Sequence, residues 1–332
     1  MSDAAGRREA PDAPGGTVPA ERPALSPLGI AMRRFRRNRL ALVGLGMLLG
    51  VVGACAAGIV WDRLAVWAGR PEPYLHLRPG IHPQPPSLAD PFGTDPLGRD
   101  VLARTLIGGC ISLGVGLASA AISVFIGTFW GLVAGYTGRG VDTAMMRFVD
   151  VLYGLPYVLV VILLIVVVPD RAIGLGFLGP DAEIPSVWVR TAVLFAAIGG
   201  VSWLTMARVV RGQALSLRET PFVEAARAMG AGHARIVLHE VLPNLMGTIL
   251  VCATLTVPLA ILQESFLSFL GLGVPPPMAS WGTLASEAIE AFNPVRTYWW
   301  LLLFPCLFLA ATLMGLNFVG DGLRDAFDPR SR

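Results

Sequence analysis

Apolar runs long enough to cross a bilayer constrain this chain more than any other feature. A hydrocarbon core about 30 Å thick needs roughly 20 consecutive apolar residues per helical span. Hydropathy alone supports five such spans, and a sixth run is weaker. The six predicted spans are Leu40–Val60, Ile111–Tyr136, Val149–Val168, Val187–Val210, Leu245–Leu267 and Trp299–Val319. The sequence therefore predicts an all-α, polytopic membrane protein with six transmembrane helices.

Composition agrees with this prediction. Of the 332 residues, 54% are hydrophobic and only 15% are charged, with a mean hydropathy of +0.62. An ordinary soluble domain has about a quarter of its residues charged. We therefore expect the lipid bilayer to surround most of the chain, and we expect no nucleic-acid partner.

Basic residues predict the orientation. The stretch RRFRRNR, residues 33–39, lies directly before the first apolar run. Because cytoplasmic segments are enriched in basic residues, this cluster predicts a cytoplasmic N-terminus. Six spans return the C-terminus to the cytoplasm, so we expect a multi-pass protein of the cell (inner) membrane. The basic residues of the first outer loop are a partial exception, but that loop is long and its charge counts weakly.

Three regions follow along the chain. Residues 1–32, rich in Ala, Pro, Gly and charge, are predicted to be a disordered cytoplasmic tail and not a signal peptide. Residues 33–110 hold the first span and a long extracytoplasmic loop, whose prolines exclude regular helix and which re-enters the membrane near Val101. Residues 111–332 form the remaining transmembrane domain.

Several kinds of site are excluded. All 26 basic residues are Arg; the phosphate loop G-x-x-x-x-G-K-[ST] needs a Lys, so any ATP hydrolysis must come from another polypeptide. The four cysteines show no C-x-x-C spacing, and His76 and His82 are interpreted as solvated loop residues, so no metal site is expected. We find no catalytic constellation and expect no cofactor on this chain and no enzymatic activity.

A charged segment, Phe222–Asn244, separates the fourth and fifth spans. Thr220-Pro221 supplies a helix start, strong helix formers follow, and Gly230 and Gly232 break the run. A second helix, His233–Val241, is expected to stop at Pro243. Three interpretations compete for this helix, turn, helix segment: a solvated connection, an amphipathic helix on anionic lipid, and a docking element for a soluble partner.

The residues at this point carry a family resemblance. The segment from "EAA" to "LPN" resembles the EAA loop of bacterial ABC importer permeases. Four further motifs, FGTDPLGRDVLART, AGYTGRGVDTAMMRFVDVLYGLPYVL, ESFLSFLGLGVPPPMASWGTL and GDGLRDAFDPR, resemble the dipeptide, oligopeptide and nickel permease family, specifically its C-type subunit. The resemblance covers nearly the whole chain after residue 33 and supports the sixth span.

The resemblance implies a type I, MetI-like permease fold and a set of partners. These are a second, B-type permease, one or two ABC ATPase subunits that bind ATP-Mg, and an extracytoplasmic substrate-binding protein. The loop at residues 215–244 would then couple the permease to the ATPases. The residues carried over to this role are Glu224, Ala225, Ala226, Arg227, Gly230, Leu242, Pro243 and Asn244. His239-Glu240 departs from the family pattern, which puts in doubt the ATPase surface that the loop accepts.

One ionisable residue, Glu264, is expected near the outer end of the fifth span. A charge at membrane depth is a functional hypothesis by default, so Glu264 is the candidate pathway or gate residue, with a structural contact as its alternative. An ion-coupled secondary transporter remains a competing class, although the spans hold few other charges. We favour peptides as cargo, with nickel or another small solute as the alternative.

Overall fold

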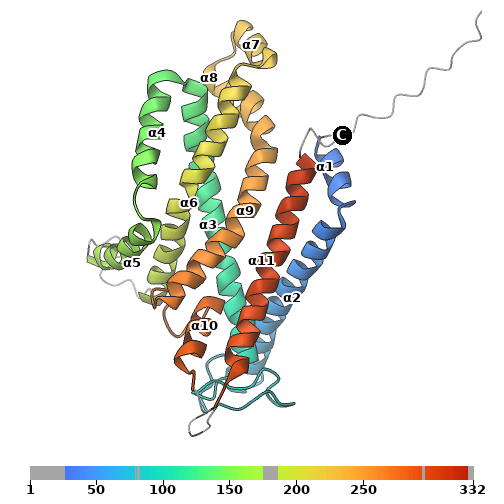
Figure 1. Ribbon diagram of the computed structural model, residues 1–332, viewed down its shortest axis with the longest axis vertical. Helices are drawn as coiled ribbons and strands as arrows, with labels where there is room; N and C mark the ends of the chain where they lie inside the picture. Colours follow the sequence, from blue (N-terminus) through green and yellow to red (C-terminus); the bar gives the residue numbers. More distant parts are fainter. Residues whose placement is uncertain (1–26, 79, 81–82, 175–185, 294–295, 328–332) are drawn as a thin grey trace, which may run out of the picture.

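The computed structural model describes residues 27–78, 80, 83–174, 186–293 and 296–327 (Figure 1). The helices are α1 (Pro27–Phe35), α2 (Arg39–Trp67), α3 (Val101–Thr137), α4 (Arg139–Tyr153), α5 (Tyr157–Gly174), α6 (Ser186–Arg218), α7 (Pro221–Ala228), α8 (His233–Ile236), η1 (Val237–Val241), α9 (Leu242–Phe269), α10 (Trp281–Glu290) and α11 (Trp299–Phe327). Within those ranges the only β pairing is a single bridge between Thr94 and Asp100. The all-α prediction is confirmed.

Five helices are each long and apolar enough to cross a membrane, and α4 with α5 makes a sixth crossing if the two are taken as one bent span. The prediction of a single third span, Val149–Val168, is wrong in detail, because α4 and α5 meet at an angle of 85°. The break falls at Gly154-Leu155-Pro156. Pro156 has no backbone N–H, and a proline disfavours the α conformation of the residue before it, here Leu155.

The long helix α3 lies at the centre of the molecule (Figure 1). It packs most extensively against α6 and also against α9, while α2 pairs with α11 on the other side. Gly127, Gly131 and Gly135 permit the close approach to α6, because a Cβ at any of them would clash with α6. Small residues let helices approach closely in lipid, so this stripe serves packing within the chain.

The two ends of the bundle differ. The α7 end carries α1, α7 and α8, and the α10 end carries α10 and the loop of residues 68–100 (Figure 1). Residues 27–32 were expected in the disordered tail, but they begin helix α1. Ala31 and Phe35 on α1 are buried with Ala41 and Ala326, and this packing holds the helix in place. The rest of the predicted tail, residues 1–26, lies outside the described residues, as does His82.

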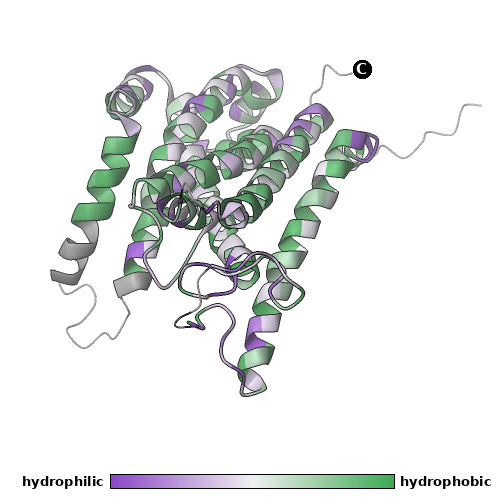
Figure 2. Ribbon diagram, turned by 60° about the horizontal axis from the view of Figure 1, so that its bottom comes forward, coloured by the Kyte–Doolittle hydropathy of each residue, from purple (hydrophilic) through white to green (hydrophobic). Residues whose placement is uncertain are grey.

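The outward faces of the bundle are apolar. Figure 2 shows hydrophobic residues along most of the helices, with hydrophilic residues gathered at helix ends and loops. Large apolar side chains such as Leu117, Phe125 and Phe129 on α3 are exposed. A helix face of this kind suits contact with lipid or with other transmembrane helices. The chain is therefore a multi-pass membrane protein.

Two helices differ from the predicted boundaries near the α10 end. Helix α3 begins at Val101, where the loop was expected to re-enter the membrane, so the region boundary drawn at residue 110 falls inside it. Helix α10 lies in an outer segment where no helix was predicted. It begins with a capping box in which Ser280 and Thr283 exchange side-chain and backbone hydrogen bonds. Thr283 stands where the usual sequence pattern has Glu or Gln, so this helix start lacks the common signature.

Candidate functional site

Helix α7 is held onto the bundle by its inner face. Pro221 occupies its first turn after Thr220, as expected for a helix start. Val223 and Ala226 are buried in the same cluster as Leu132, Val210 and Leu245, which belong to α3, α6 and α9. This burial fixes the position of α7 at the α7 end of the molecule.

The outer face of α7 presents both charge and apolar surface. Glu224, Ala225 and Arg227 are exposed, and Met229 next to them is 82% exposed. Met side chains are flexible and polarizable, and so adapt to irregular partner surfaces. An exposed helix with this mixture is suited to docking into a groove on another protein.

Gly230 ends α7 in a left-handed turn. Its φ is +81°, a conformation that Gly adopts without the steric cost of a Cβ. The Ala231 N–H bonds to Ala226 O, and the Gly230 N–H bonds to Arg227 O. These bonds satisfy carbonyls that the helix end would leave free. The predicted break at Gly230 is therefore a defined turn and not a loose connection.

The second half of the segment does not stop at Pro243, contrary to the prediction. Helix α8 passes into a π turn, η1, and then directly into α9, with Pro243 in the first turn of α9. A proline ring clashes with the carbonyl four residues earlier. The widened turn avoids this conflict, and the Leu242 N–H bonds to Val237 O, five residues back.

The structure separates the predicted coupling residues into two groups. Glu224, Ala225, Ala226, Arg227 and Gly230 lie on α7 and its turn, whereas Leu242, Pro243 and Asn244 begin α9. The Asn244 side chain donates to Glu240 O at 2.6 Å, so it stabilises the π turn. The departure at His239-Glu240 falls inside this π turn.

The segment between the two groups is tied to α3. A hydrogen bond of 3.1 Å joins the Tyr136 hydroxyl to His233 Nδ1. The two rings also meet edge to face. The start of α8 is therefore connected directly to the central helix of the bundle.

Glu264 lies in α9 and is fully buried. The hydroxyls of Ser268 and Ser280 both donate to its Oε1 at 2.6 Å. Because Ser280 is the N-cap of α10, the carboxyl group connects α9 to α10. This placement favours the structural contact that was the alternative for Glu264.

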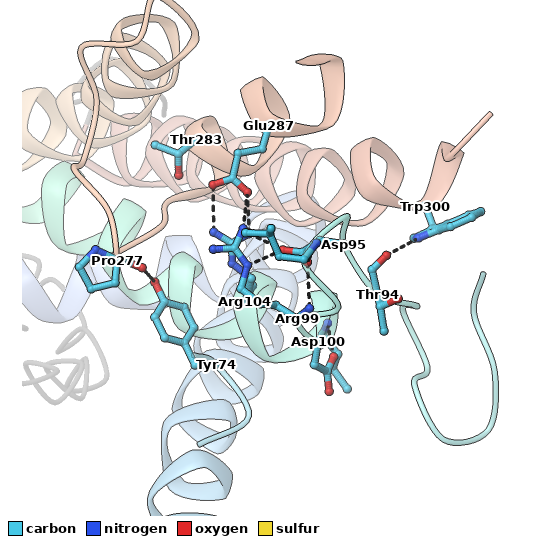
Figure 3. Close-up of polar contacts among 12 residues, drawn as sticks. Tyr74, Thr94, Asp95, Arg99, Asp100, Arg104, Pro277, Thr283, Glu287 and Trp300 are labelled. Carbon is cyan, nitrogen blue, oxygen red and sulfur yellow. Dashed lines mark hydrogen bonds and ion pairs between the residues drawn. The ribbon is translucent and has the colours of Figure 1, made fainter. Parts of the chain in front are cut away.

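A buried ionic cluster at the α10 end was not predicted. Arg104 is 2% exposed and donates to Asp95 at 3.0 Å and to both oxygens of Glu287 at 2.5 and 3.0 Å (Figure 3). Arg99 also contacts Asp95 and Glu287. The charges of the loop are visible in the sequence, but Glu287 lies 183 residues from Arg104, and no local pattern joins them.

Two further contacts hold the loop of residues 68–100 against the bundle. The Tyr74 hydroxyl donates to Pro277 O, and the Trp300 indole donates to Thr94 O (Figure 3). Burial raises the pKa of Tyr74, so its hydroxyl keeps the proton that it donates. Burial likewise raises the pKa of Asp100, although this N-cap of α3 accepts from two backbone N–H groups.

A cavity of about 560 Å³ opens near this cluster. Its walls come from α5, α6, the end of α9, the following loop and α10. The charged residues on its wall are Arg190 and Glu287, and polar Ser268, Thr283 and Ser286 also line it. A cavity at the α10 end with one positive and one negative side chain on its wall can receive a polar solute that carries both charges.

Comparison with known proteins assigns the family. Residues 127–332 match the family described as "Binding-protein-dependent transport system inner membrane component", and residues 26–68 match the "N-terminal TM domain of oligopeptide transport permease C".

Three curated relatives illustrate the similarity. The oligopeptide transport system permease protein OppC of Bacillus subtilis is 40% identical over 91% of this chain and 89% of its own length. The dipeptide transport system permease protein DppC of the same organism is 42% identical over 94% and 88%. The OppC protein of Escherichia coli K12 is 47% identical over 73% and 72%.

A solved structure shares the fold. The inward-facing MetNI methionine ABC transporter matches with a TM-score of 0.50, over 67% of this chain and 96% of the matched chain, at 19% identity. Together with the five membrane-length helices and the bent α4–α5 pair, these matches show that the chain belongs to the binding-protein-dependent transport system inner membrane components, as a permease subunit of an ABC transporter and not an enzyme.

Proposed function

We propose that this chain is the C-type permease subunit of an ATP-driven importer of di- or oligopeptides. The observation that carries the proposal is the similarity, over about nine tenths of both chains, to permeases of oligopeptide and dipeptide transport systems. In the proposed complex it pairs with a B-type permease, one or two ABC ATPases that bind ATP-Mg, and an extracytoplasmic substrate-binding protein.

The proposed point of energy input is α7 with its turn. Exposed Glu224 and Arg227 supply polar contacts to a cleft on the ATPase, and exposed Met229 supplies apolar contact. Buried Val223 and Ala226 carry the resulting force into the cluster shared with α3, α6 and α9. ATP binding closes the ATPases, the two permeases rock against each other, and hydrolysis resets them.

The α7 end faces the cytoplasm in this proposal, and so do both termini. The cluster of residues 33–39 and the arginines of α7 and α8 lie at that end, as the positive-inside rule requires. The cavity beside Arg190 and Glu287 then opens on the outside. It is placed to receive a zwitterionic peptide from the binding protein.

Reconstitution of the whole complex tests the proposal. In proteoliposomes that contain both permeases and the ATPases, with the binding protein outside, we expect ATP-dependent uptake of a labelled tripeptide. Glu224→Arg is expected to abolish uptake and to remove stimulation of the ATPase by the loaded binding protein. Asp321→Arg is the matched control, because Asp321 is an exposed carboxylate on α11.

Two outcomes would contradict the proposal. If the wild-type complex carries nickel and no peptide, the substrate class is wrong. If Glu224→Arg leaves both uptake and ATPase stimulation at the level of Asp321→Arg, α7 is not the coupling element.

A further inference from the structure

A second cavity lies where the third crossing is broken. It measures about 230 Å³ and is lined by α4, α5, α6 and α9. The residues on its wall are Leu152, Tyr153, Leu155, Tyr157, Val201, Ser202, Leu204, Thr205 and Gln263. It shares no lining residue with the larger cavity at the α10 end.

This cavity lies at membrane depth. Residues 201–205 on its wall are about midway along α6, which runs from Ser186 to Arg218. Figure 1 shows α4 descending from the α7 end next to the end of α3, and α5 turning aside about half-way down the molecule. Irregular backbone at this depth is tolerated where it is buried in protein or lines a polar cavity.

The break leaves backbone acceptors free. Among the described residues, no backbone N–H is bonded to the carbonyls of Tyr153, Gly154 or Leu155. Tyr153 and Leu155 also line the cavity. All three residues are exposed in this chain, so the break is open to a ligand, and a carbonyl without a donor gains when water or a ligand supplies one.

Two side chains on the same wall are also unsatisfied. The Tyr157 hydroxyl and Gln263 Oε1 are buried, and neither has a hydrogen-bond partner among the described residues. Tyr157 begins α5 and Gln263 lies on α9, so the two come from separate helices. Buried polar atoms are nearly always hydrogen-bonded. Five other buried side-chain oxygens of the described residues also lack a partner, but only Tyr157 and Gln263 among these residues line this cavity. Together the two side chains offer one hydroxyl donor and one acceptor oxygen.

The break is held in place from the α7 side. Arg211 Nη2 donates to Asp142 Oδ2 at 2.7 Å, and Arg208 donates to Asp150 at 2.7 Å. Arg208 also stacks on the Tyr153 ring. These contacts join α4 to α6 next to the break.

From this arrangement we infer that the cavity binds the main-chain amide of peptide cargo as it passes through the membrane. Gln263 Oε1 accepts the amide N–H, and the Tyr157 hydroxyl donates to the amide C=O. The inference rests on the proposed function, because it names a contact for the cargo of that transporter. The volume equals that of roughly eight waters at about 30 Å³ each, enough for a peptide unit and its flanking atoms.

Main-chain recognition suits a peptide transporter. Every peptide offers the same amide donor and acceptor, so a site that hydrogen-bonds only to these groups accepts peptides with varied side chains. A site that hydrogen-bonds a substrate N–H discriminates strongly against an analogue that lacks it. The cavity wall holds no charged residue, which also fits an uncharged amide.

Two minimal substitutions test the inference in the reconstituted complex. Tyr157→Phe removes one hydroxyl and Gln263→Met removes the amide oxygen while keeping the chain length. Each is expected to lower tripeptide uptake about tenfold, the loss expected for one hydrogen bond. ATPase stimulation by the loaded binding protein should stay within about twofold of wild type, because α7 is untouched. Tyr298→Phe and Gln213→Leu are the matched controls, since both residues lie outside the cavity.

A second probe separates contact with cargo from a structural role. A tripeptide with N-methylated amides lacks the N–H that Gln263 accepts. With uptake normalised to the loading of the binding protein, the wild-type complex should prefer the unmethylated peptide by about tenfold. Gln263→Met should reduce this preference to near unity.

The outcomes are distinguishable from failure of the proposed function, which would appear as absent peptide uptake in the wild type. If the wild type imports peptide and both variants match their controls, the inference is overturned. It is also overturned if uptake and ATPase stimulation fall together, because the two residues then act in the ATPase-driven cycle and not on the cargo. Failure of the variants to assemble overturns it too, because the cavity is then a contact with the partner permease.

Discussion

At the residue scale, buried polar groups mark the functional parts of this molecule. Arg104 satisfies Asp95 and Glu287 at one end, and Glu264 receives two serine hydroxyls between α9 and α10. The Tyr157 hydroxyl and Gln263 Oε1 remain without partners in the smaller cavity. Satisfied polar networks stabilise the fold. Glu264 Oε2 also lacks a partner among the described residues, so it is the cavity beside Tyr157 and Gln263 that distinguishes those two groups as a candidate ligand site.

Arg104→Ala tests the ionic cluster. It leaves Asp95 and Glu287 with Arg99 as their remaining cation, and removing one partner of a buried pair costs about 3 kcal/mol. We expect a clear fall in the melting temperature of the detergent-solubilised complex. Asp150→Asn is the control, because its pair with Arg208 is exposed and worth about 1 kcal/mol or less. Equal shifts for the two variants would show that the cluster adds no special stability.

At the element scale, the segment between α6 and α9 consists of two short helices, α7 and α8, joined by a left-handed turn, and a π turn that runs into α9. The signals for α7 and its turn are local, namely Pro221, the helix formers and Gly230. No local sequence signal predicts the π turn, because Pro243 ordinarily predicts the end of a helix. Burial of Ile236 and Val241 in the shared cluster keeps the chain helical through it.

A matched pair of glycines tests whether the turn matters for coupling. Gly230 has φ +81°, whereas Gly232 has φ −66°, and neither has a neighbour that a Cβ would meet. Gly230→Ala forces a left-handed alanine at a cost of about 1 kcal/mol, so peptide uptake by the complex should fall about fivefold. Gly232→Ala adds the same methyl group without strain and should leave uptake near wild type. A similar loss in both variants would assign the effect to docking contact and not to the backbone conformation of the turn.

At the scale of the whole molecule, the bundle has two different ends. One carries α1, α7 and α8, and the other carries α10 with the loop that Arg104 and Tyr74 anchor (Figures 1 and 3). In the proposed complex the permease connects an ATPase at one end to a binding protein at the other. The two cavities lie between these ends, at the break of the third crossing and beside α10.

Reporter fusions test the proposed orientation. Alkaline phosphatase, which is active only outside the cytoplasm, should be active when fused after Gly80 and inactive when fused after Arg332. A green fluorescent protein fused at Arg332 should fluoresce. Replacement of Arg33, Arg34, Arg36, Arg37 and Arg39 by Gln should produce molecules of mixed orientation, because the basic cluster retains the N-terminus inside. The reverse pattern in the unaltered chain would place α7 outside and exclude its coupling role.

The sequence by itself determined the membrane class, the approximate helices and the exposed segment at residues 222–244. Those features follow from local physics: lipid demands long apolar helices, and proline, glycine and strong helix formers act within a few residues. The re-entry of the chain into the membrane near Val101 and the end of α7 at Gly230 were predictable for this reason, although the predicted span began only at Ile111.

Only the tertiary structure decided how these elements meet. Gly154-Leu155-Pro156 breaks the helix locally, but the 85° angle between α4 and α5 is seen only in the structure, as are the arginine and aspartate pairs that join α4 to α6. Arg104 and Glu287 are 183 residues apart, and Glu264 and Ser280 lie on different helices. Such contacts, and the cavities between helices, arise from the relative placement of distant segments, which no local pattern in the chain encodes.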